Sequence, residues 1–363
     1  MRITFVLPGY PWKPVGGFRV VYEYANRLVA RGHEVIIVHS RRLPNWSPPP
    51  PPNLYYWVRR KVGYLRDLIF RPTVRWQPID PRVQMLYVPE PTAKYVPNAD
   101  AVFATWWATA EIVAELPKSK GQKFYLIMDF YPYHASKSQL QNTWRLPLKK
   151  VAISSWLFRM VIESGVPDND IMNIPIGIDH QRFRLSQDIA ARSKKVAMMY
   201  SKANYKSPKD GLKALEICKQ KHANLEVTVF GPSSRPKGLP SWIKYVANAS
   251  EEDLVKIYNS SRIFLSSSLA EGFALPPAEA MACGCAVVAT DSGGIREYAE
   301  HEKTALLSPP GNPEALAKNL LRVLEDDDLR IRLAKAGNER IKEFTWERST
   351  NLLEQFLIQH VRI

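Results

Sequence analysis

The sequence is poor in cysteine and contains no long hydrophobic run. Three cysteines among 363 residues, two of them in Cys283-Gly284-Cys285, suggest neither a disulfide framework nor a four-ligand metal site. No apolar stretch reaches the roughly 18 residues that a membrane-spanning helix needs. The apolar run at residues 3–7 is too short for a signal peptide, so we expect it to be a first strand. These absences predict a cytoplasmic protein with no metal site.

Acidic residues are scarce relative to basic ones, at 35 against 50, which gives a formal net charge of +15. Within residues 41–76, eight Lys or Arg residues accompany Asp67 alone and are interleaved with seven aromatic residues. Cations beside aromatic rings suit an anionic membrane surface, so we expect a contact at the inner face of the membrane. Nucleic acid is a rival partner, but no recognised nucleic-acid motif accompanies the charge, and we expect none to bind. A solvated surface without a partner is the third alternative.

The length and composition suit two globular domains, each with its own core. Residues 3–7, 18–30 and 34–39 have the pattern strand, helix, strand, with a loop rich in proline and glycine at residues 8–17. The alternation continues along the chain. Further strands are expected at 100–105, 124–128, 195–200, 225–230, 262–266, 286–290 and 305–307, and further helices at 155–163, 210–219, 251–260, 312–325, 328–344 and 346–359. This order predicts an α/β protein with two parallel sheets.

The domain boundaries follow from the same pattern. We expect a first domain over residues 1–185, interrupted by the basic segment 41–76, which follows five consecutive prolines at 48–52. The second domain should cover residues 186–345. The final segment, 346–363, is expected to complete the first domain.

Two carboxylates, Glu271 and Glu279, flank the expected start of a helix. Pro276-Pro277 favours a helix start, because proline is pre-organised for the first turn and has no N–H to leave unpaired. The free amides of Gly272, Phe273 and Ala274 would then form an anion site at the helix N-terminus. From the spacing alone, the alternative is equally good: Glu279 stabilises the helix from its first turn, and Glu271 is an unrelated loop residue.

The surrounding residues favour the functional interpretation. The run Ser266-Ser267-Ser268-Leu269-Ala270-Glu271-Gly272-Phe273-Ala274-Leu275-Pro276, followed by Glu279-Ala280-Met281-Ala282-Cys283-Gly284, closely resembles the donor site of family 4 glycosyltransferases. The resemblance implies the B-type glycosyltransferase fold, in which two Rossmann-like domains face each other across a cleft and the last helix returns to the first domain. It further implies a retaining hexosyltransferase, nearest to bacterial polysaccharide or O-antigen mannosyl- and rhamnosyltransferases.

By this resemblance the substrates are a nucleoside-diphosphate sugar and a glycan or lipid-linked acceptor, with no cofactor. Glu279 should accept hydrogen bonds from the donor ribose, and Glu271 should lie beside the sugar. The amides of Gly272, Phe273, Ala274 and Leu275 should face the diphosphate or the sugar hydroxyls. Gly16 and Gly17 should let the backbone approach a phosphate or sugar.

Two positions depart from the family pattern. The family places Arg and Lys five residues apart near the diphosphate; Lys206 fits the Lys, but Ser201 stands where Arg is expected. Lys202 is a weak substitute, because an ammonium cannot copy a guanidinium fork. Many relatives have a His where this chain has Met128, which leaves Asp129 as the candidate site residue of the first domain. No residue is assigned as general base, and His134 fits a surface residue better.

Three other functions remain open at this point. Ser201 and Met128 are compatible with a catalytically weak carbohydrate-binding subunit. A sugar-nucleotide epimerase shares the architecture, although the Glu271 and Glu279 loop argues against it. A glycan phosphorylase lacks support, because no cofactor-lysine motif is visible.

Overall fold

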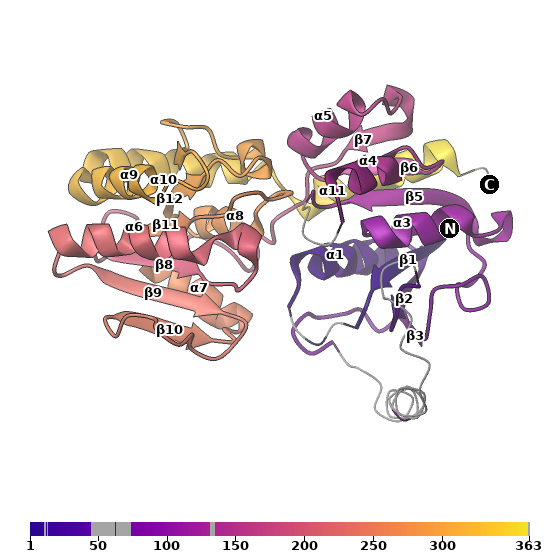
Figure 1. The fold of residues 1–363 in the computed structure, drawn as a ribbon, viewed down its shortest axis with the longest axis horizontal. Helices are drawn as coiled ribbons and strands as arrows, with labels where there is room; N and C mark the ends of the chain where they lie inside the picture. The colour runs from indigo at the N-terminus through magenta and orange to yellow at the C-terminus, as the bar shows by residue number, and fades with distance from the viewer. Residues whose placement is uncertain (11, 13, 45–61, 63–73, 131–134, 362–363) are drawn as a thin grey trace.

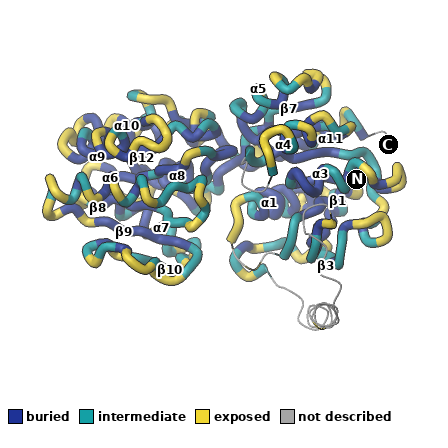
Figure 2. Tube along the Cα trace, in the orientation of Figure 1, coloured by how far each residue is buried: buried dark blue, intermediate teal, exposed yellow. Residues whose placement is uncertain are grey.

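The computed structural model describes residues 1–10, 12, 14–44, 62, 74–130 and 135–361. Most of the basic segment 41–76, and His134, lie outside these ranges, so the membrane contact stays a prediction. The described chain forms two α/β domains joined by a narrow waist (Figure 1). In both, the central strands are the most deeply buried elements, and exposed residues gather on the outer helices and loops (Figure 2).

The first domain is built on a parallel sheet with the strand order β3-β2-β1-β4-β5-β6-β7. Its central strands are almost wholly apolar, as expected of a parallel sheet covered by helices on both faces. The strands are β1 (Arg2–Pro8), β2 (Glu34–Ser40), β3 (Gln84–Val88), β4 (Ala101–Ala104), β5 (Gln122–Ile127), β6 (Lys149–Ala152) and β7 (Ile171–Asn173), and the helices are α1 (Gly16–Ala30), α3 (Trp107–Glu115), α4 (Lys137–Trp144) and α5 (Ser155–Glu163), with 3-10 turns at Lys118–Lys120 and Asp168–Asp170.

The second domain repeats the plan with the strand order β10-β9-β8-β11-β12-β13, and every pairing is parallel. The strands are β8 (Lys195–Met199), β9 (Glu226–Gly231), β10 (Ile243–Ala247), β11 (Ile263–Ser266), β12 (Ala286–Thr290) and β13 (Ala305–Ser308). The helices are α6 (Pro208–Lys221), α7 (Glu251–Ser260), α8 (Leu275–Ala282), α9 (Pro313–Glu325) and α10 (Asp327–Ile341), with 3-10 turns at Asn204–Lys206 and Gly294–Glu297.

The last helix, α11 (Trp346–His360), crosses back and packs on the first domain. Its Trp346 ring meets Tyr24 of α1 at 5.4 Å between centroids, and Phe356 meets Phe124 of β5 at 5.9 Å. Arg31 at the end of α1 donates to Glu354 at 2.9 Å. This helix therefore adds apolar surface to the core of the first domain.

The predicted fold class, two parallel-sheet α/β domains with a returning last helix, is confirmed. The predicted boundary of the first helix is wrong, because α1 begins at Gly16 rather than at residue 18. Glycine has low helix propensity because of its backbone entropy, so the pair gave no helical signal in the sequence. Strands β3, β6, β7 and β10 were not predicted; each is short, and β3, β7 and β10 are edge strands while β6 lies next to one.

Among the residues that the structure describes, no helix combines the length and apolar character needed to cross a membrane.

The two chain crossings between the domains run side by side. The Ile178 amide donates to the Phe344 carbonyl at 2.9 Å, and Ile178 and Thr345 form an isolated parallel bridge. A Cβ atom on Gly177 would lie 2.1 Å from the backbone nitrogen of Trp346. Only glycine allows this approach of two backbones.

We therefore expect Gly177→Ala to push the crossings apart and lower the free energy of unfolding by about 1–3 kcal/mol, the usual cost of overpacking. Thermal and urea unfolding would measure the loss. Gly16→Ala is the matched control, because a Cβ there meets no atom within 4 Å. Equal stability of the two variants would show that the crossings separate without cost.

Candidate functional site

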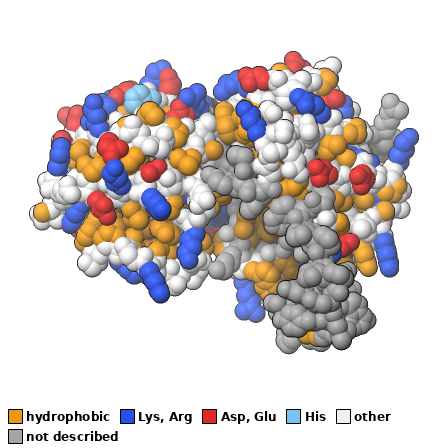
Figure 3. All heavy atoms as spheres, viewed as in Figure 1, with side chains coloured by type: hydrophobic (Ala, Val, Ile, Leu, Met, Phe, Trp, Pro, Cys, Tyr) orange, Lys and Arg blue, Asp and Glu red, His pale blue; other side chains and the backbone are white. Residues whose placement is uncertain are grey.

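A cleft of about 1900 Å³ lies between the two domains. It is bordered by residues that follow the carboxyl ends of β1, β4, β5, β8, β9 and β11, the edge where open parallel sheets bind ligands. Figure 3 shows the surface hollowed where the two lobes meet. Every predicted site residue lines this one cleft: Gly16, Gly17, Asp129, Lys202, Lys206, Glu271, Gly272, Phe273, Ala274, Leu275 and Glu279.

Glu271 is buried in the loop between β11 and α8. Its amide donates to the Ser292 carbonyl at 2.8 Å, and its own carbonyl accepts from the Gly294 amide at 2.9 Å. Its carboxylate accepts from Ser268 Oγ at 2.7 Å and forms an ion pair with Lys206 Nζ at 2.5 Å. Backbone and side chain are therefore both fixed, and the charge of Glu271 is balanced by Lys206.

Gly272 brings the second domain into contact with the first. A Cβ atom there would lie 1.9 Å from the carbonyl oxygen of Met128, which directly follows β5. A Cβ on Gly294 would in turn lie 2.1 Å from the Gly272 carbonyl oxygen. Glycine at 272 is required by this close packing of backbones.

The residues at the start of α8 line the cleft, and a diphosphate contact of their amides stays a prediction. Ala274 takes a left-handed conformation, with φ of 68°, and turns the chain into Leu275 and the first helical turn. The Phe273 side chain points away into the core, where it packs against Tyr298 and Phe344 at 5.3 and 5.9 Å between centroids. Phe273 can therefore act on a ligand only through its backbone.

Glu279 lies one turn into α8 and is only 4% exposed. Its Oε1 accepts from Arg19 Nη1 at 2.7 Å, and its Oε2 accepts from the Tyr258 hydroxyl at 3.3 Å. Burial raises the pKa of Glu279, and the neighbouring Arg19 opposes this shift. The carboxylate expected to bind ribose is thus covered by a side chain from the other domain.

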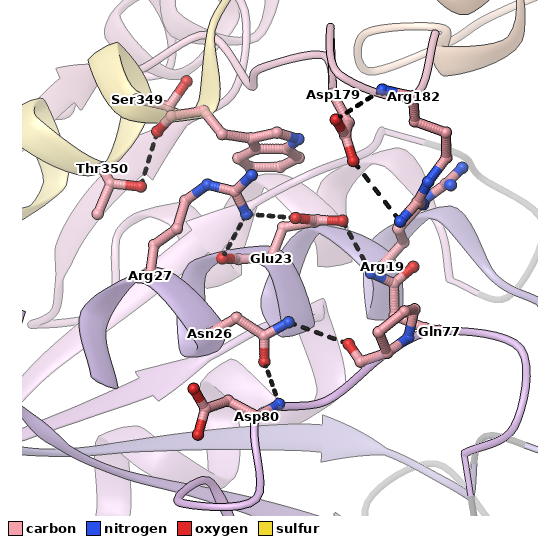
Figure 4. A network of polar contacts seen from close by, with 12 residues as sticks. Arg19, Glu23, Asn26, Arg27, Gln77, Asp80, Asp179, Arg182, Ser349 and Thr350 are labelled. Atoms are coloured by element: carbon pink, nitrogen blue, oxygen red, sulfur yellow. Dashed lines mark hydrogen bonds and ion pairs between the residues drawn. The ribbon is translucent and has the colours of Figure 1, made fainter. Parts of the chain in front are cut away.

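Arg19, Glu251 and Arg182 are site residues that the sequence analysis missed. Arg19 lies in the first turn of α1 and donates to Glu251 Oε1 at 2.6 Å, and Arg182 donates to the same oxygen. Arg182 also forms an ion pair with Asp179 (Figure 4). A signal was available, because a cation in the first turn of a helix opposes the helix dipole and needs an acidic partner.

The glycine pair Gly16-Gly17 opens α1 at the floor of the cleft. A Cβ on Gly17 would lie 3.3 Å from the Met128 methyl carbon, so this helix end also packs against the residue after β5. Buried His39 holds the loop before this helix in place. Its Nδ1 contacts the Gly9 carbonyl at 2.9 Å, and its Nε2 contacts the Tyr22 hydroxyl. Burial lowers the pKa of His39 to about 4, so the ring is neutral and Nδ1 donates.

The two lysines differ in their surroundings. Lys206 closes the 3-10 turn Asn204–Lys206 and is held against Glu271, whereas Lys202 is exposed at the cleft wall. Ser201 accepts a hydrogen bond from the Ala203 amide at 3.2 Å and so shapes the loop. The cation expected at position 201 is absent, and Lys206 is the better-placed lysine.

Asp129 follows Met128 at the end of β5 and faces the cleft. Burial raises the pKa of its carboxyl to about 6, and the charge of Glu271 adds to the shift. Asp129 therefore changes its protonation within the range of ordinary assays.

A model of the family "Glycosyl transferases group 1" matches residues 179–340. The match covers Lys206, Glu271 and Glu279 and nearly all of the second domain. Over these residues the second domain is similar to the group 1 glycosyl transferases. The first domain, with Asp129 and the glycine pair, lies outside the matched residues.

Relatives with curated names match parts of the chain. An O-antigen chain mannosyltransferase B from Escherichia coli is 34% identical over 109 residues, which are 30% of this chain and 28% of the relative. A D-inositol 3-phosphate glycosyltransferase from Corynebacterium jeikeium is 28% identical over 207 residues, 52% of this chain and 49% of the relative. The likeness spans less than half the length of either relative.

Solved structures match the whole chain in fold. Sucrose-phosphate synthase from Thermosynechococcus elongatus superposes with a TM-score of 0.73 at 18% identity, over 99% of this chain and 98% of that one. Anabaena HepE in complex with UDP-glucose gives 0.74 at 16% identity, over 99% and 100% of the two chains. The two domains together therefore form a GT-B-like fold.

The raised pKa of Asp129 has a consequence for stability. The folded protein keeps a proton on Asp129 that the unfolded chain, with an ordinary value near 4, has released. Between about pH 4 and pH 6 the folded state binds more protons at this site, so its contribution to the free energy of unfolding falls as the pH rises.

We expect Asp129→Asn, which cannot ionise, to be more stable than the unsubstituted protein at pH 7.5, by on the order of 3 kcal/mol. The gain should largely vanish at pH 4. Urea unfolding at the two pH values would measure it, with exposed Asp168→Asn as control. A gain that does not depend on pH would contradict the assignment.

Proposed function

We propose that this protein is a retaining glycosyltransferase that moves a sugar from a nucleoside-diphosphate sugar to a glycan or glycolipid in surface polysaccharide biosynthesis. One observation carries the proposal. The Lys206–Glu271 pair, the buried carboxylate of Glu279 and the first-turn amides of α8 converge on one cleft between the domains. These groups suit the sugar, the ribose and the diphosphate of a single ligand.

Each group has a distinct task in the proposed reaction. Glu279 accepts hydrogen bonds from the ribose hydroxyls. Lys206 and the amides from Gly272 to Leu275 stabilise the charge that grows on the departing diphosphate. Glu271 lies beside the sugar, where a carboxylate stabilises positive charge at the anomeric carbon. Gly16 and Gly17 allow the backbone of the first domain to close on the same ligand.

Asp129 completes the cleft from the first domain. Its pKa of about 6 lets it exchange a proton near neutral pH, and it lies close enough to Glu271 for the two charges to interact. We propose that it orients an acceptor or sugar hydroxyl. We assign no general base, and the leaving phosphate is the group proposed to receive the acceptor proton.

No divalent cation is expected to be required, because Lys206 and the helix amides supply the positive charge. The relatives named as a mannosyltransferase and an inositol phosphate glycosyltransferase, and the UDP-glucose complex of HepE, support a nucleotide-sugar donor. The second candidate function is a catalytically weak carbohydrate-binding subunit, favoured by Ser201 and Met128.

Slow donor hydrolysis tests the proposal directly. The protein would be incubated with UDP-, GDP- and dTDP-sugars, with and without EDTA, and the released nucleoside diphosphate and the freed sugar would be followed. We expect release from one donor, unchanged by EDTA and with retained anomeric configuration. Binding without release would favour the subunit, and an isomerised intact donor would favour an epimerase. Loss of release in EDTA that manganese or magnesium restores would mean the diphosphate site is misassigned.

Glu271→Gln should lower kcat for this release by roughly 10²-fold, the scale of a lost electrostatic stabiliser in a transition state. Affinity for the nucleoside diphosphate should change little, whereas Glu279→Ala should weaken it. Exposed Glu300→Gln in the same domain is the matched control. Full activity of Glu271→Gln would remove this residue from the catalytic machinery.

The basic segment 41–76 is proposed to bind an anionic surface. Each Lys or Arg near an acidic membrane contributes about 1 kcal/mol, so several together give useful affinity that salt weakens. An anionic acceptor, such as a lipid diphosphate or acidic glycan, is the alternative ligand of this segment.

Flotation with vesicles tests the membrane contact. We expect binding to vesicles that contain phosphatidylserine, not to neutral ones, and weaker binding when Arg59, Arg60 and Lys61 are replaced by Ser. Replacing Lys209, Lys213 and Lys221 removes the same charge from the exposed face of α6 and should have no effect. Indifference to acidic vesicles at low salt would end the membrane proposal.

A further inference from the structure

Arg19 lies between the two domains in an arrangement that donor binding cannot leave unchanged. Its side chain is 17% exposed and bridges Glu279 and Glu251, both from the second domain, at 2.7 and 2.6 Å. Burial disfavours its charge, but the two carboxylates outweigh this effect and raise the pKa of Arg19. The cleft therefore holds a full guanidinium charge where the proposed ribose must bind.

The carboxylate of Glu279 has no room for a ribose in this arrangement. Its side chain is 5% exposed, Arg19 occupies Oε1, and the Tyr258 hydroxyl occupies Oε2. Tyr258 belongs to the same domain and is itself buried in the core. Arg19 comes from the opposite domain, and its guanidinium group lies at the end of a long flexible side chain. The guanidinium group is therefore the one that can move.

The residues around Arg19 can remain in place when its side chain moves away from Glu279. Glu251 also accepts from Arg182, so its charge stays compensated when Arg19 leaves. The guanidinium carbon of Arg19 lies 5.7 Å from the ring centroid of Phe183. The face of this ring can stabilise the cation while the side chain changes conformation. Arg19 follows Gly16-Gly17 by two residues, so its backbone stays at the glycine turn while its tip moves.

We propose that Arg19 exchanges partners when a nucleoside diphosphate binds: it yields Glu279 to the ribose hydroxyls and binds the diphosphate of the same ligand. This inference rests on the proposed function.

The exchange keeps the guanidinium of Arg19 paired with an anionic group. Arg19 trades a carboxylate for a phosphate, which its planar fork can bind through two parallel hydrogen bonds. The phosphate is tethered to the ribose through one methylene, so it lies within reach of a side chain that has just left the ribose site. Arg19 would also supply the positive charge that is missing at Ser201, where the family has an arginine. Lys206 alone does not supply it, because it is already paired with Glu271.

A comparison of nucleosides with their diphosphates tests the exchange. Kd values would be measured by NMR titration for uridine and UDP, guanosine and GDP, and thymidine and dTDP, on the intact chain and on Arg19→Gln. We expect the diphosphate affinity to fall roughly tenfold or more, the effect of a lost charge-assisted contact. Nucleoside affinity should stay within about twofold or improve, because Glu279 is no longer covered.

Arg184→Gln is the matched control, since Arg184 is exposed and does not line the cleft; its diphosphate-to-nucleoside ratio should be unchanged. Arg19→Lys retains the charge and decides the question if Arg19→Gln does not fold, again through a loss confined to the diphosphate. An equal loss of affinity for nucleoside and diphosphate would show that Arg19 only holds Glu279 in place. No loss of affinity for either would exclude a phosphate contact. Either result would overturn the proposed exchange. If the intact chain bound no nucleotide at all, the proposed function itself would fail first.

Discussion

The site depends on the contact between Gly272 and the Met128 carbonyl, because it sets the distance between the domains at the floor of the cleft. A side chain at 272 would collide with that carbonyl at 1.9 Å. The backbone approach brings Asp129 within electrostatic reach of Glu271 and places α1 opposite α8. Without it, the two halves of the site would be separate surfaces on separate domains.

Buried charge is balanced across this contact. Glu271 is neutralised by Lys206 within the second domain, whereas Glu279 is neutralised by Arg19 from the first. Asp129 has no such cation among the groups that shift its pKa, and the carboxyl accordingly stays protonated to about pH 6. The Arg19–Glu279 ion pair between the domains therefore involves the carboxylate that is proposed to bind the ribose. Ligand binding is thus linked to the domain interface.

Much of the architecture followed from local pattern. Apolar runs of five or six residues between helical segments predicted the central strands, because a strand covered on both faces must be apolar throughout. The short edge strands β3 and β10 gave no such signal, since their faces are only partly buried. Similarly, the glycine pair at Gly16 was expected to be loop, because glycine carries no helical signal even where the first turn accepts it.

The sequence by itself determined the order of the central strands and of the second domain's helices, the helix start at Pro276-Pro277, and the run of residues from Glu271 to Glu279, because these depend on neighbours along the chain. Tertiary structure alone decided that Arg19 covers Glu279 and that Glu251 and Arg182 share its charge. These residues are brought together from positions up to 260 apart in the chain. Ion pairs of this kind depend on how two folded domains meet, and no local propensity or spacing encodes that geometry.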